Sequence, residues 1–510
     1  MDPITFLPLI ISFIIACTTY VFFFWVFSKN PQHKNLPPGP PPYPIIGNIL
    51  DLGITKFHQS LNNLSKTYGP IMSLKIGTIS TIVISSANTA KEAFRKNDQA
   101  FASRLVPQSV QALDHHKASV IFTPSSNLKW KTLRKLCTTN VFSPQFLDST
   151  EGLREKKLLE LLGFLQERCR NSGEAIDIGE TVFTTVLNSA SNTFFSVDLA
   201  DRCSDSSHKF RDIIWSVLAE ASKYNIADYF PVLSLFDPQG AKRRMRKYYR
   251  ELLTVFESII EERIHKVDSV SDNHDDVLES FLCLNKDNSE FTRHDMSHLF
   301  LDLFVAGVDS TASTIQWAMA ELLHNPEKMI KTKKELQQFL TKEQQFLKAS
   351  DISKLPYLQA IIKETLRLHP AAPVLVHKSE VEAQTCGFTV PKDTLVLINL
   401  WALGRDPSVW PDPNVFLPER FLEGENSQRD FRGNNNDCEF IPFGVGRRMC
   451  PGIPFAYRVA HTVLALLLQH FDLKIENGRN HEDMDMEEAF GITLHKINGL
   501  RVIPTPIKLE

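Results

Sequence analysis

The sequence lacks paired cysteines and an excess of charge of either sign. Its eight cysteines are scattered over 510 residues without a Cys-x-x-Cys pair. Neither a zinc ribbon nor a disulfide framework is expected, and the pattern is typical of a reducing compartment. Lys and Arg number 56 against 59 Asp and Glu, for a net charge of −3. This balance gives no general case for nucleic-acid binding, and we predict no nucleic-acid partner.

Complete nucleotide-binding and iron–sulfur motifs are also missing. Gly444 and Gly446 resemble the start of a dinucleotide fingerprint, but Met449 occupies the place of the third glycine and no βαβ pattern precedes them. No cysteine spacing fits an iron–sulfur cluster. What is present is ordinary for a globular chain, with 43% hydrophobic and 23% charged residues. That composition excludes a disordered or fibrous protein.

The N-terminal segment, residues 4–27, contains no charged side chain. It is long enough to cross the ~30 Å hydrocarbon layer of a bilayer. Aromatic residues 22–25 end it, which does not fit a cleaved signal peptide. Lys29 and Lys34 follow, so the positive-inside tendency places the rest of the chain in the cytosol. We therefore predict a transmembrane anchor over residues 4–27, with a buried core helix as the alternative.

A proline run over residues 36–44 follows the apolar segment. Successive prolines remove backbone donors and restrict φ, so the run is expected to be stiff and extended. We predict that residues 28–48 form a basic and proline-rich spacer that orients the remaining chain against the bilayer. A ligand for SH3-type modules is the alternative.

The remaining chain, residues 49–510, shows no internal repeat and no obvious linker, which predicts one large domain. Residues 78–85 are rich in β-branched side chains and predict a strand next to a second strand over residues 71–76. Residues 151–340 have mainly helical apolar spacing, and a second group of strands is expected around residues 387–400. The predicted fold class is mainly α with minor β.

The segment over residues 442–452, Pro-Phe-Gly-Val-Gly-Arg-Arg-Met-Cys-Pro-Gly, fits the pattern Phe-x-x-Gly-x-Arg-x-Cys-x-Gly. At about one in twenty for each fixed position, the chance expectation in this chain is on the order of 10⁻⁴. The two glycines allow the backbone to turn closely around a flat partner, and Arg448 offers a cation for a carboxylate of that partner. Backbone N–H groups and the following helix N-terminus are expected to lower the pKa of the Cys450 thiol. An inert buried cysteine in a glycine turn is the alternative.

On these residues the chain resembles the cytochrome P450 family of haem-thiolate monooxygenases over residues 36–510. The resemblance implies the cytochrome P450 fold, haem b as the cofactor, and Cys450 as the axial ligand of the haem iron. Residues 130–134 resemble the segment that contacts a haem propionate, and His377 stands where the family places Arg or His; a purely structural histidine is the alternative. The implied cofactor-binding residues are Trp130, Arg134, His377, Phe443, Arg448 and Cys450.

Residues 300–323 are apolar nearly all round, which predicts a long central helix. Within it, Ser310 can donate to the carbonyl of Ala306 and loosen the helix, which would open a notch for O₂ and water. Asp309 and Ser310 are then the expected proton relay, a general-acid role. The family pattern usually has Thr directly after the acid, so Thr311 is a second candidate for the hydroxyl; an incidental polar kink is the alternative.

Glu364 and Arg367 lie three residues apart, which places both on one face of a helix. A surface ion pair is the default interpretation. The resemblance implies instead a structural network of Glu364, Arg367 and Arg420 behind the haem.

Residues 237–240 and 401–407 resemble plant microsomal members of the family, and in particular the geraniol 8-hydroxylase and ferruginol synthase group. The resemblance implies hydroxylation of a hydrophobic plant specialised metabolite, a terpenoid such as a monoterpenol or a diterpene. An alkaloid, a phenolic or an aromatic amino acid is the alternative substrate. An isomerase or dehydratase that does not use O₂, and a haem-binding sensor without turnover, are the alternative functions. The substrate pocket implied by the resemblance comprises Ile121, Phe122, Phe304, Val305, Ala372, Val374, Leu375, Phe490 and Ile492.

Oxygenation at a haem needs two electrons, and the chain has no flavin or nicotinamide motif. We therefore expect a separate reductase, NADPH–cytochrome P450 reductase, in the same membrane. Lys129, Lys131, Lys135 and Arg447 are candidates for its docking face, with solvated surface cations as the alternative. The other expected partners are O₂, the substrate and membrane lipid. The predicted location is the endoplasmic reticulum membrane, single-pass, with the catalytic domain in the cytosol.

Overall fold

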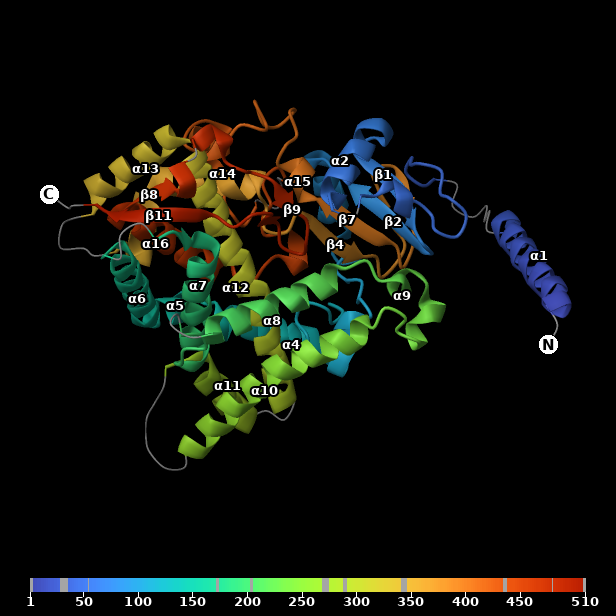
Figure 1. Cartoon of the computed structure of the whole chain (residues 1–510), viewed down its shortest axis with the longest axis horizontal. Coiled ribbons are helices and arrows are strands. Elements are labelled where there is room, and N and C mark those ends of the chain that lie inside the picture. Colours follow the sequence, from blue (N-terminus) through green and yellow to red (C-terminus); the bar gives the residue numbers. More distant parts are fainter. Residues whose placement is uncertain are drawn as a thin grey trace.

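The computed structural model describes residues 3–27, 35–53, 55–170, 174–201, 205–267, 275–287, 291–340, 346–433, 438–478 and 480–507. Figure 1 shows a mainly helical body with a smaller region of sheet, in agreement with the predicted fold class. Helix α1 (Pro3–Phe27) lies beside this body rather than within it. Within the described ranges, no helix combines the length and hydropathy needed to cross a bilayer. The anchor predicted over residues 4–27 is therefore not confirmed.

The proline-rich stretch lies against the first strand, β1 (Ile71–Ile76). Ser73 donates from its backbone N–H to the carbonyl of Pro38 at 2.8 Å and from its hydroxyl to the carbonyl of Pro37 at 2.7 Å. Prolines keep their carbonyl acceptors although they lack donors, so this run can dock on a strand edge. Residues 28–34 of the predicted spacer lie outside the described residues.

Helix α12 (Arg293–His324) is the central element of the body and contains the predicted helix over residues 300–323. It begins at a capping box in which Thr292 and Asp295 bond reciprocally. Most of its length is buried, and it packs against α7 and α16. The other helices are α2 (Phe57–Tyr68), α3 (Ala87–Asn97), α4 (Leu128–Leu136), α5 (Pro144–Ser149), α6 (Glu151–Arg170), α7 (Ile178–Phe195), α8 (Asp205–Ser222), α9 (Ile226–Tyr229), α10 (Ala241–Val267), α11 (Val277–Asp287), α13 (Pro326–Phe339), α14 (Pro356–Leu368), α15 (Leu400–Leu403) and α16 (Ile453–His470).

The largest sheet has the strand order β1-β2-β7-β4. Strands β2 and β7 pair in parallel, and the other neighbours are antiparallel. A second sheet has the order β3-β11-β8, and β5-β6 and β9-β10 are two-stranded. The other strands are β2 (Ile79–Ile84), β3 (Ile176–Asp177), β4 (Val374–Lys378), β5 (Ala383–Thr385), β6 (Phe388–Val390), β7 (Leu395–Asn399), β8 (Phe471–Ile475), β9 (Glu488–Ala489), β10 (His495–Lys496) and β11 (Arg501–Pro506).

The strands predicted over residues 71–76, 78–85 and 387–400 are confirmed, with differences at their ends. Strand β2 begins one residue late because Gly77, with φ +58°, forms the turn into it. Strand β7 ends at Asn399, whose side chain accepts from the backbone N–H of Ala402 and begins α15. A capping residue at a strand end thus converts the last part of the predicted strand into a helical turn.

Candidate active site

A cavity of about 720 Å³ lies between the Cys450 segment, α12 and strand β4. Its volume falls in the range of ~300–1,000 Å³ typical of small-molecule sites. Residues far apart in the sequence meet around it, and they include most of the predicted site. The predicted residues that line it are Ile121, Phe122, Trp130, Arg134, Val305, Ser310, Thr311, Ala372, Val374, Leu375, His377, Phe443, Arg448, Cys450, Phe490 and Ile492.

The backbone around Cys450 turns at a glycine whose positive φ would strain any other residue. Gly446 has φ +70°, and a Cβ built on it would lie 2.0 Å from Oδ1 of Asp98. The same Asp98 oxygen accepts from the backbone N–H of Arg447 at 3.0 Å. After this turn, the N–H of Cys450 donates to the carbonyl of Phe443 at 2.9 Å. The turn and this bond present the sulfur to the cavity.

The thiol of Cys450 differs in one respect from the expectation. Burial raises its pKa, while the backbone N–H groups of Gly452 and Ile453 and the charges of Arg134 and Arg104 act in the opposite direction without cancelling it. The N-terminus of α16 therefore favours the thiolate, as predicted, but the desolvation of the Cys450 sulfur is the larger effect. A buried thiolate of this kind needs a cationic partner such as a metal ion.

Three arginines, of which Arg448 is buried and Arg104 and Arg134 are half-buried, line the cavity without carboxylate partners. The ion pairs formed within the described ranges include none to Arg104, Arg134 or Arg448. Burial, followed by the charges of Arg104 and Arg134, lowers the pKa of Arg448 to about 9. Burial lowers the pKa of Arg104 to about 10, and its Nε atom is buried without a hydrogen-bond partner. Such a cluster is costly unless an anion joins it.

Arg448 lies over the ring of Trp130, 4.6 Å from guanidinium carbon to ring centre, and donates to several backbone carbonyls. Trp130 in turn donates from Nε1 to the carbonyl of Val120 at 3.0 Å. These contacts hold the guanidinium at the cavity edge. These residues fit a haem. The two propionates of a haem match guanidinium groups that have no carboxylate partner, and its iron matches the soft sulfur of Cys450. A bound haem would supply O₂ activation, and the residues described here would hold it.

His377 lies in the cavity wall on β4, but it does not add a charge to this cluster. Its Nδ1 atom lies 2.9 Å from the carbonyl oxygen of Phe101. Burial, followed by the charge of Arg104, lowers the pKa of His377 to about 3, so the ring is neutral. With its proton shared with a carbonyl, the other ring nitrogen is an acceptor. The cationic contacts to propionates therefore fall to the arginines.

Arg104 was not predicted from the sequence. It precedes an apolar stretch in a loop, and no local pattern distinguishes it from a surface arginine. Its NH1 group donates to the carbonyl of Val376 on β4, which is distant in sequence. Only the tertiary structure shows that its Nε atom is buried and that its charge acts on Cys450 and Arg448.

The hydroxyl groups of Ser310 and Thr311 both line the cavity. Ser310 Oγ donates to the carbonyl of Ala306 at 2.7 Å, as predicted, and Thr311 Oγ1 donates to the carbonyl of Gly307 at 2.7 Å. Helix α12 is continuous through this step. A Cβ built on Gly307 would meet no other heavy atom within 4 Å, so space remains open beside the hydroxyls. The predicted notch takes the form of a missing side chain in an intact helix.

Asp309 does not line the cavity but points toward α8 and β10. Its Oδ1 accepts from Nε1 of Trp215 at 2.8 Å, and its Oδ2 lies 3.1 Å from Nε2 of His495. The carboxylate is 2% exposed, whereas the His495 side chain is 30% exposed. Burial lowers the pKa of His495, but the charge of Asp309 outweighs burial and raises it overall. Neither partner was predicted.

Phe304, predicted for the substrate pocket, belongs to the core instead. Its ring packs against Phe194, Phe195 and Phe256, with ring centres 5.4, 5.6 and 5.1 Å away. It is fully buried and does not line the cavity. Successive helical residues point about 100° apart, so Val305 faces the cavity while Phe304 faces α7 and α10.

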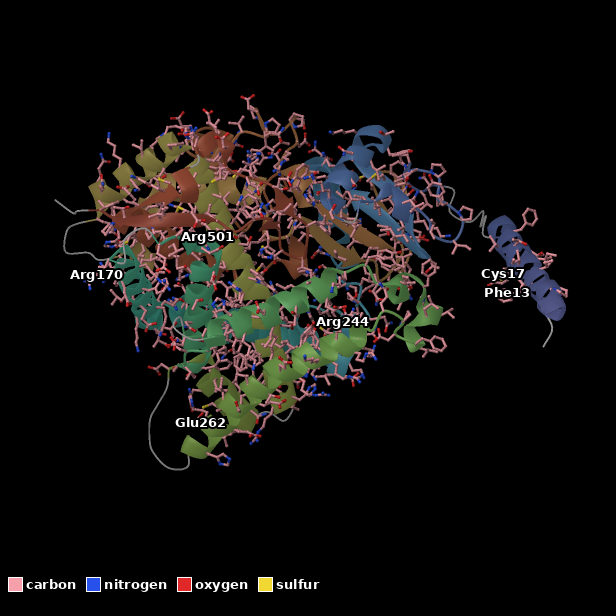
Figure 2. All side chains as sticks on the ribbon, viewed as in Figure 1. Phe13, Cys17, Arg170, Arg244, Glu262 and Arg501 are labelled. Atoms are coloured by element: carbon pink, nitrogen blue, oxygen red, sulfur yellow. The ribbon has the colours of Figure 1, made fainter. Side chains whose placement is uncertain are left out.

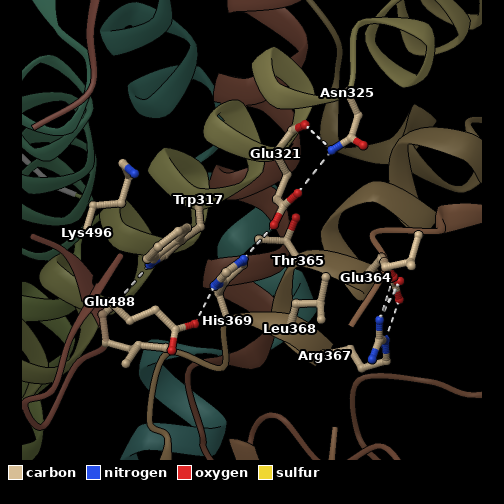
Figure 3. A network of polar contacts seen from close by, with 12 residues as sticks. Trp317, Glu321, Asn325, Glu364, Thr365, Arg367, Leu368, His369, Glu488 and Lys496 are labelled. Atoms are coloured by element: carbon tan, nitrogen blue, oxygen red, sulfur yellow. Dashed lines mark hydrogen bonds and ion pairs between the residues drawn. The ribbon is translucent and has the colours of Figure 1, made fainter. Parts of the chain in front are cut away.

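Glu364, Arg367 and Arg420 form a buried network outside the cavity. Both oxygens of Glu364 accept from Arg367 at 2.7 Å, and Oε1 also accepts from Arg420 at 3.0 Å. Figure 3 shows the Glu364–Arg367 pair on α14. The structure therefore brings the three predicted structural residues together. Because none of them lines the cavity, they support the fold around it rather than the chemistry.

The helical body and the buried thiol segment are those of a haem-thiolate enzyme. The family model for cytochrome P450 matches residues 37–500. The chain thus belongs to the cytochrome P450 family and is a monooxygenase of that class. The family implies a haem-thiolate iron and electrons from a redox partner.

Relatives of similar length support this assignment. The chain is 46% identical over 504 residues to cytochrome P450 76T24 of Catharanthus roseus, covering 98% of this chain and 99% of the relative. It is 45% identical over 507 residues to geraniol 8-hydroxylase of Swertia mussotii, with 98% and 99% covered. It is also 43% identical over 486 residues to a geranylhydroquinone 3''-hydroxylase of Arnebia euchroma, with 94% and 96% covered.

Proposed function

We propose that the protein hydroxylates a hydrophobic terpenoid of plant specialised metabolism, such as a monoterpenol or a diterpene. It uses O₂, haem b held by Cys450, and electrons from NADPH delivered by a separate NADPH–cytochrome P450 reductase. Two similar relatives are named as hydroxylases of geraniol and geranylhydroquinone, both of which carry a terpenoid chain.

The observation that carries this proposal is the apolar part of the cavity wall, which is separate from the arginines described above. The predicted pocket positions that line it hold only hydrocarbon side chains: Ile121, Phe122, Val305, Ala372, Val374, Leu375, Phe490 and Ile492. Burial of a terpenoid against them removes apolar surface from water at about 25 cal/mol per Å². The charged ends of an aromatic amino acid would lose their solvation wherever they lie against these hydrocarbon side chains. A terpenoid therefore fits this wall better than an amino acid.

Ser310 and Thr311 are proposed to hold protons and water beside the substrate. Each hydroxyl hydrogen is engaged by a backbone carbonyl of α12. Their lone pairs remain free to accept from a water in the open space beside Gly307. Asp309, which does not line the cavity itself, is proposed to pass protons toward this water by way of the neighbouring Ser310.

Attachment to the endoplasmic reticulum membrane, with the catalytic domain in the cytosol, is also part of the proposal. It is supported by the absence of charge from residues 4–27 and by the apolar side chains that α1 exposes, among them Phe13 (Figure 2). The test is extraction of microsomes at alkaline pH, which releases peripheral proteins. Retention in the pellet for the full chain, with release after deletion of residues 1–27, is expected. Release of the full chain would contradict the anchor.

Lys131 and Lys135 on α4, together with Arg447, are the exposed members of the proposed reductase-docking face. Among the candidates, Lys129 pairs with Asp295 at 2.6 Å and Arg447 with Asp98 at 3.5 Å. Charge reversal of Lys131 and Lys135 is expected to slow reduction and to leave ligand binding unchanged. An unchanged reduction rate would remove α4 from the docking face.

The deciding experiment is co-expression with a plant reductase in yeast microsomes that are incubated with geraniol, a diterpene olefin, tyrosine and an alkaloid. We expect a hydroxylated terpenoid that requires NADPH and O₂ and is absent for Cys450→Ala. Conversion of tyrosine or the alkaloid alone would overturn the substrate class. Turnover without NADPH and O₂ would overturn the monooxygenase proposal.

A further inference from the structure

The segment that joins β9 to β10 forms one wall of the cavity and is attached at both ends. Residues 490–493 of this segment line the cavity. At its C-terminal end, the carbonyl of Leu494 accepts from Ser313 Oγ at 2.8 Å and from Trp317 Nε1 at 3.0 Å, both on α12. At its N-terminal end, the attachment is the side chain of Glu488, which is 7% exposed. The part of the cavity wall formed by residues 490–493 is thus held in place by contacts at both of its ends.

The carboxylate of Glu488 collects contacts from three other elements. Nδ1 of His369 lies 2.9 Å from it, and Nε1 of Trp401 donates to it at 2.9 Å. His58 and Arg405 approach to 3.4 and 3.5 Å. Burial alone would raise the pKa of Glu488, but the hydrogen bonds from His369 and His58 outweigh it and lower that pKa. A buried charge that is satisfied this fully resists displacement.

His369, which ends α14, connects Glu488 to the central helix (Figure 3). Its Nε2 atom lies 2.7 Å from Oε1 of Glu321 on α12, so each ring nitrogen faces a carboxylate. Its ring stacks on Trp317 with centres 3.9 Å apart and planes within 2°. Trp317 also donates a hydrogen bond to Leu494. The contacts at the two ends of the segment are therefore both connected to Trp317.

The Glu488 network reaches the cavity through His58 and Phe490. The ring of Phe490 stacks on His58, with centres 5.4 Å apart and an angle of 20°, and it contacts Phe57 at 5.4 Å. His58 is fully buried and also lies at the Glu488 carboxylate. A movement of Glu488 therefore changes both the backbone two residues before Phe490 and the ring against which Phe490 packs.

From this arrangement we infer that Glu488 is a positioning residue for substrate specificity, which fixes Phe490 and thereby the shape of the substrate-facing wall. The inference deepens the proposed function and rests on it for the presence of a haem and an apolar substrate. Glu488 contacts neither substrate nor haem, and it acts through the His58–Phe490 stack.

The test is Glu488→Gln in the holoenzyme, measured by optical titration of the haem with two nitrogen ligands. Unsubstituted imidazole is small enough to bind the iron without touching the wall, whereas 1-phenylimidazole carries an apolar ring that must fill the cavity. We expect the Kd for 1-phenylimidazole to rise about tenfold, because a displaced Phe490 loses contact with the phenyl ring. The Kd for imidazole should stay unchanged. With a terpenoid substrate, KM and the ratio of hydroxylated positions should change more than kcat.

A matched control separates positioning from loss of stability. Asp276, directly before α11, is a carboxylate with a fully buried side chain that pairs with Arg263 of α10 at 2.9 Å. It does not line the cavity. Asp276→Asn should lower the melting temperature as Glu488→Gln does, but should leave both Kd values unchanged. Trp401→Phe removes one hydrogen bond to Glu488 and keeps an aromatic ring at the position. It should reproduce the effect on 1-phenylimidazole at a smaller amplitude if Glu488→Gln does not retain haem.

A double-mutant cycle tests the route through Phe490. In a Phe490→Ala background, Glu488→Gln should add little to the Kd for 1-phenylimidazole, since residues that act through one another are not additive. Full additivity would overturn the proposed route. Equal behaviour of Glu488→Gln and Asp276→Asn would reduce Glu488 to a structural residue. If geraniol fails as a substrate while 1-phenylimidazole still discriminates the variants, the proposed substrate is wrong and the positioning role stands.

Discussion

Asp309 and His495 form an ion pair, 3.1 Å from Oδ2 to Nε2, that joins a buried carboxylate to an imidazole with a partly exposed side chain. Asp309 does not line the cavity, whereas Ser310 and Thr311 do. Trp215 holds the second oxygen of Asp309 at 2.8 Å. This geometry gives Asp309 a route to solvent that avoids the cavity.

Replacement of His495 by Gln should lower the fraction of NADPH electrons that reach product, because Asp309 loses its proton donor. General acid groups contribute ~10²–10⁴-fold, so a loss of about tenfold for an indirect donor is reasonable. Asp309 raises the pKa of His495, so the imidazole is charged below that raised value and loses its proton as the pH rises through it. The rate of product formation by the wild type should therefore fall as the pH rises through the raised pKa of His495. This alkaline decrease should be absent in His495→Gln.

His324→Gln is the matched control for that prediction, because His324 ends the same helix and bonds the carbonyl of His481 away from the cavity. Product formed per NADPH consumed, across the pH range, is the measurement. An unchanged pH profile in His495→Gln would show that protons reach Asp309 by another path.

Replacement of Cys450 by Ala should abolish the red-shifted Soret band of the reduced carbon-monoxide complex, since only thiolate ligation produces it. Cys283→Ala is the control, because Cys283 is exposed on α11. A spectrum of the Cys450→Ala variant identical to wild type would contradict ligation through this sulfur.

Arg104→Ala should speed the loss of haem to an excess of apomyoglobin by about tenfold, the effect of one charge-assisted contact of ~1.5–3 kcal/mol shared among several arginines. The unsatisfied Nε of Arg104 is the reason to expect a carboxylate beside it. Arg95→Ala, on the exposed face of α3, should have no effect on haem loss. Equal rates in the two variants would mean that Arg104 does not contact the cofactor.

Glu364→Gln should destabilise the fold strongly, because it leaves the buried guanidinium groups of Arg367 and Arg420 short of a counter-charge. Loss of one member of such a network costs about 3–5 kcal/mol. Glu476→Gln, which breaks an exposed pair with Arg501, should change little. The midpoint of thermal unfolding, followed by circular dichroism, compares the two. Similar midpoints would show that the buried network adds no more than a surface pair.

Some features of the site were predictable because they depend on neighbours in the sequence. The glycines around Cys450 dictate a turn that ends at the start of α16, and the apolar run over residues 300–323 can only be a buried helix. Ser310 bonds the carbonyl four residues earlier, a contact that helical geometry sets by itself. Glu364 and Arg367 likewise meet because one helical turn separates them.

The sequence by itself determined the local backbone and hence the class of enzyme, because a motif of consecutive residues carries its own conformation. Only the tertiary structure decided which side chains meet across the chain. It placed Phe304 in the core, paired Asp309 with His495, brought Arg104 near Cys450 and attached the segment that carries Phe490 through Glu488. These pairings join segments separated by tens to hundreds of residues. Their partners are selected by how the packed helices and sheets come together, which no local pattern encodes.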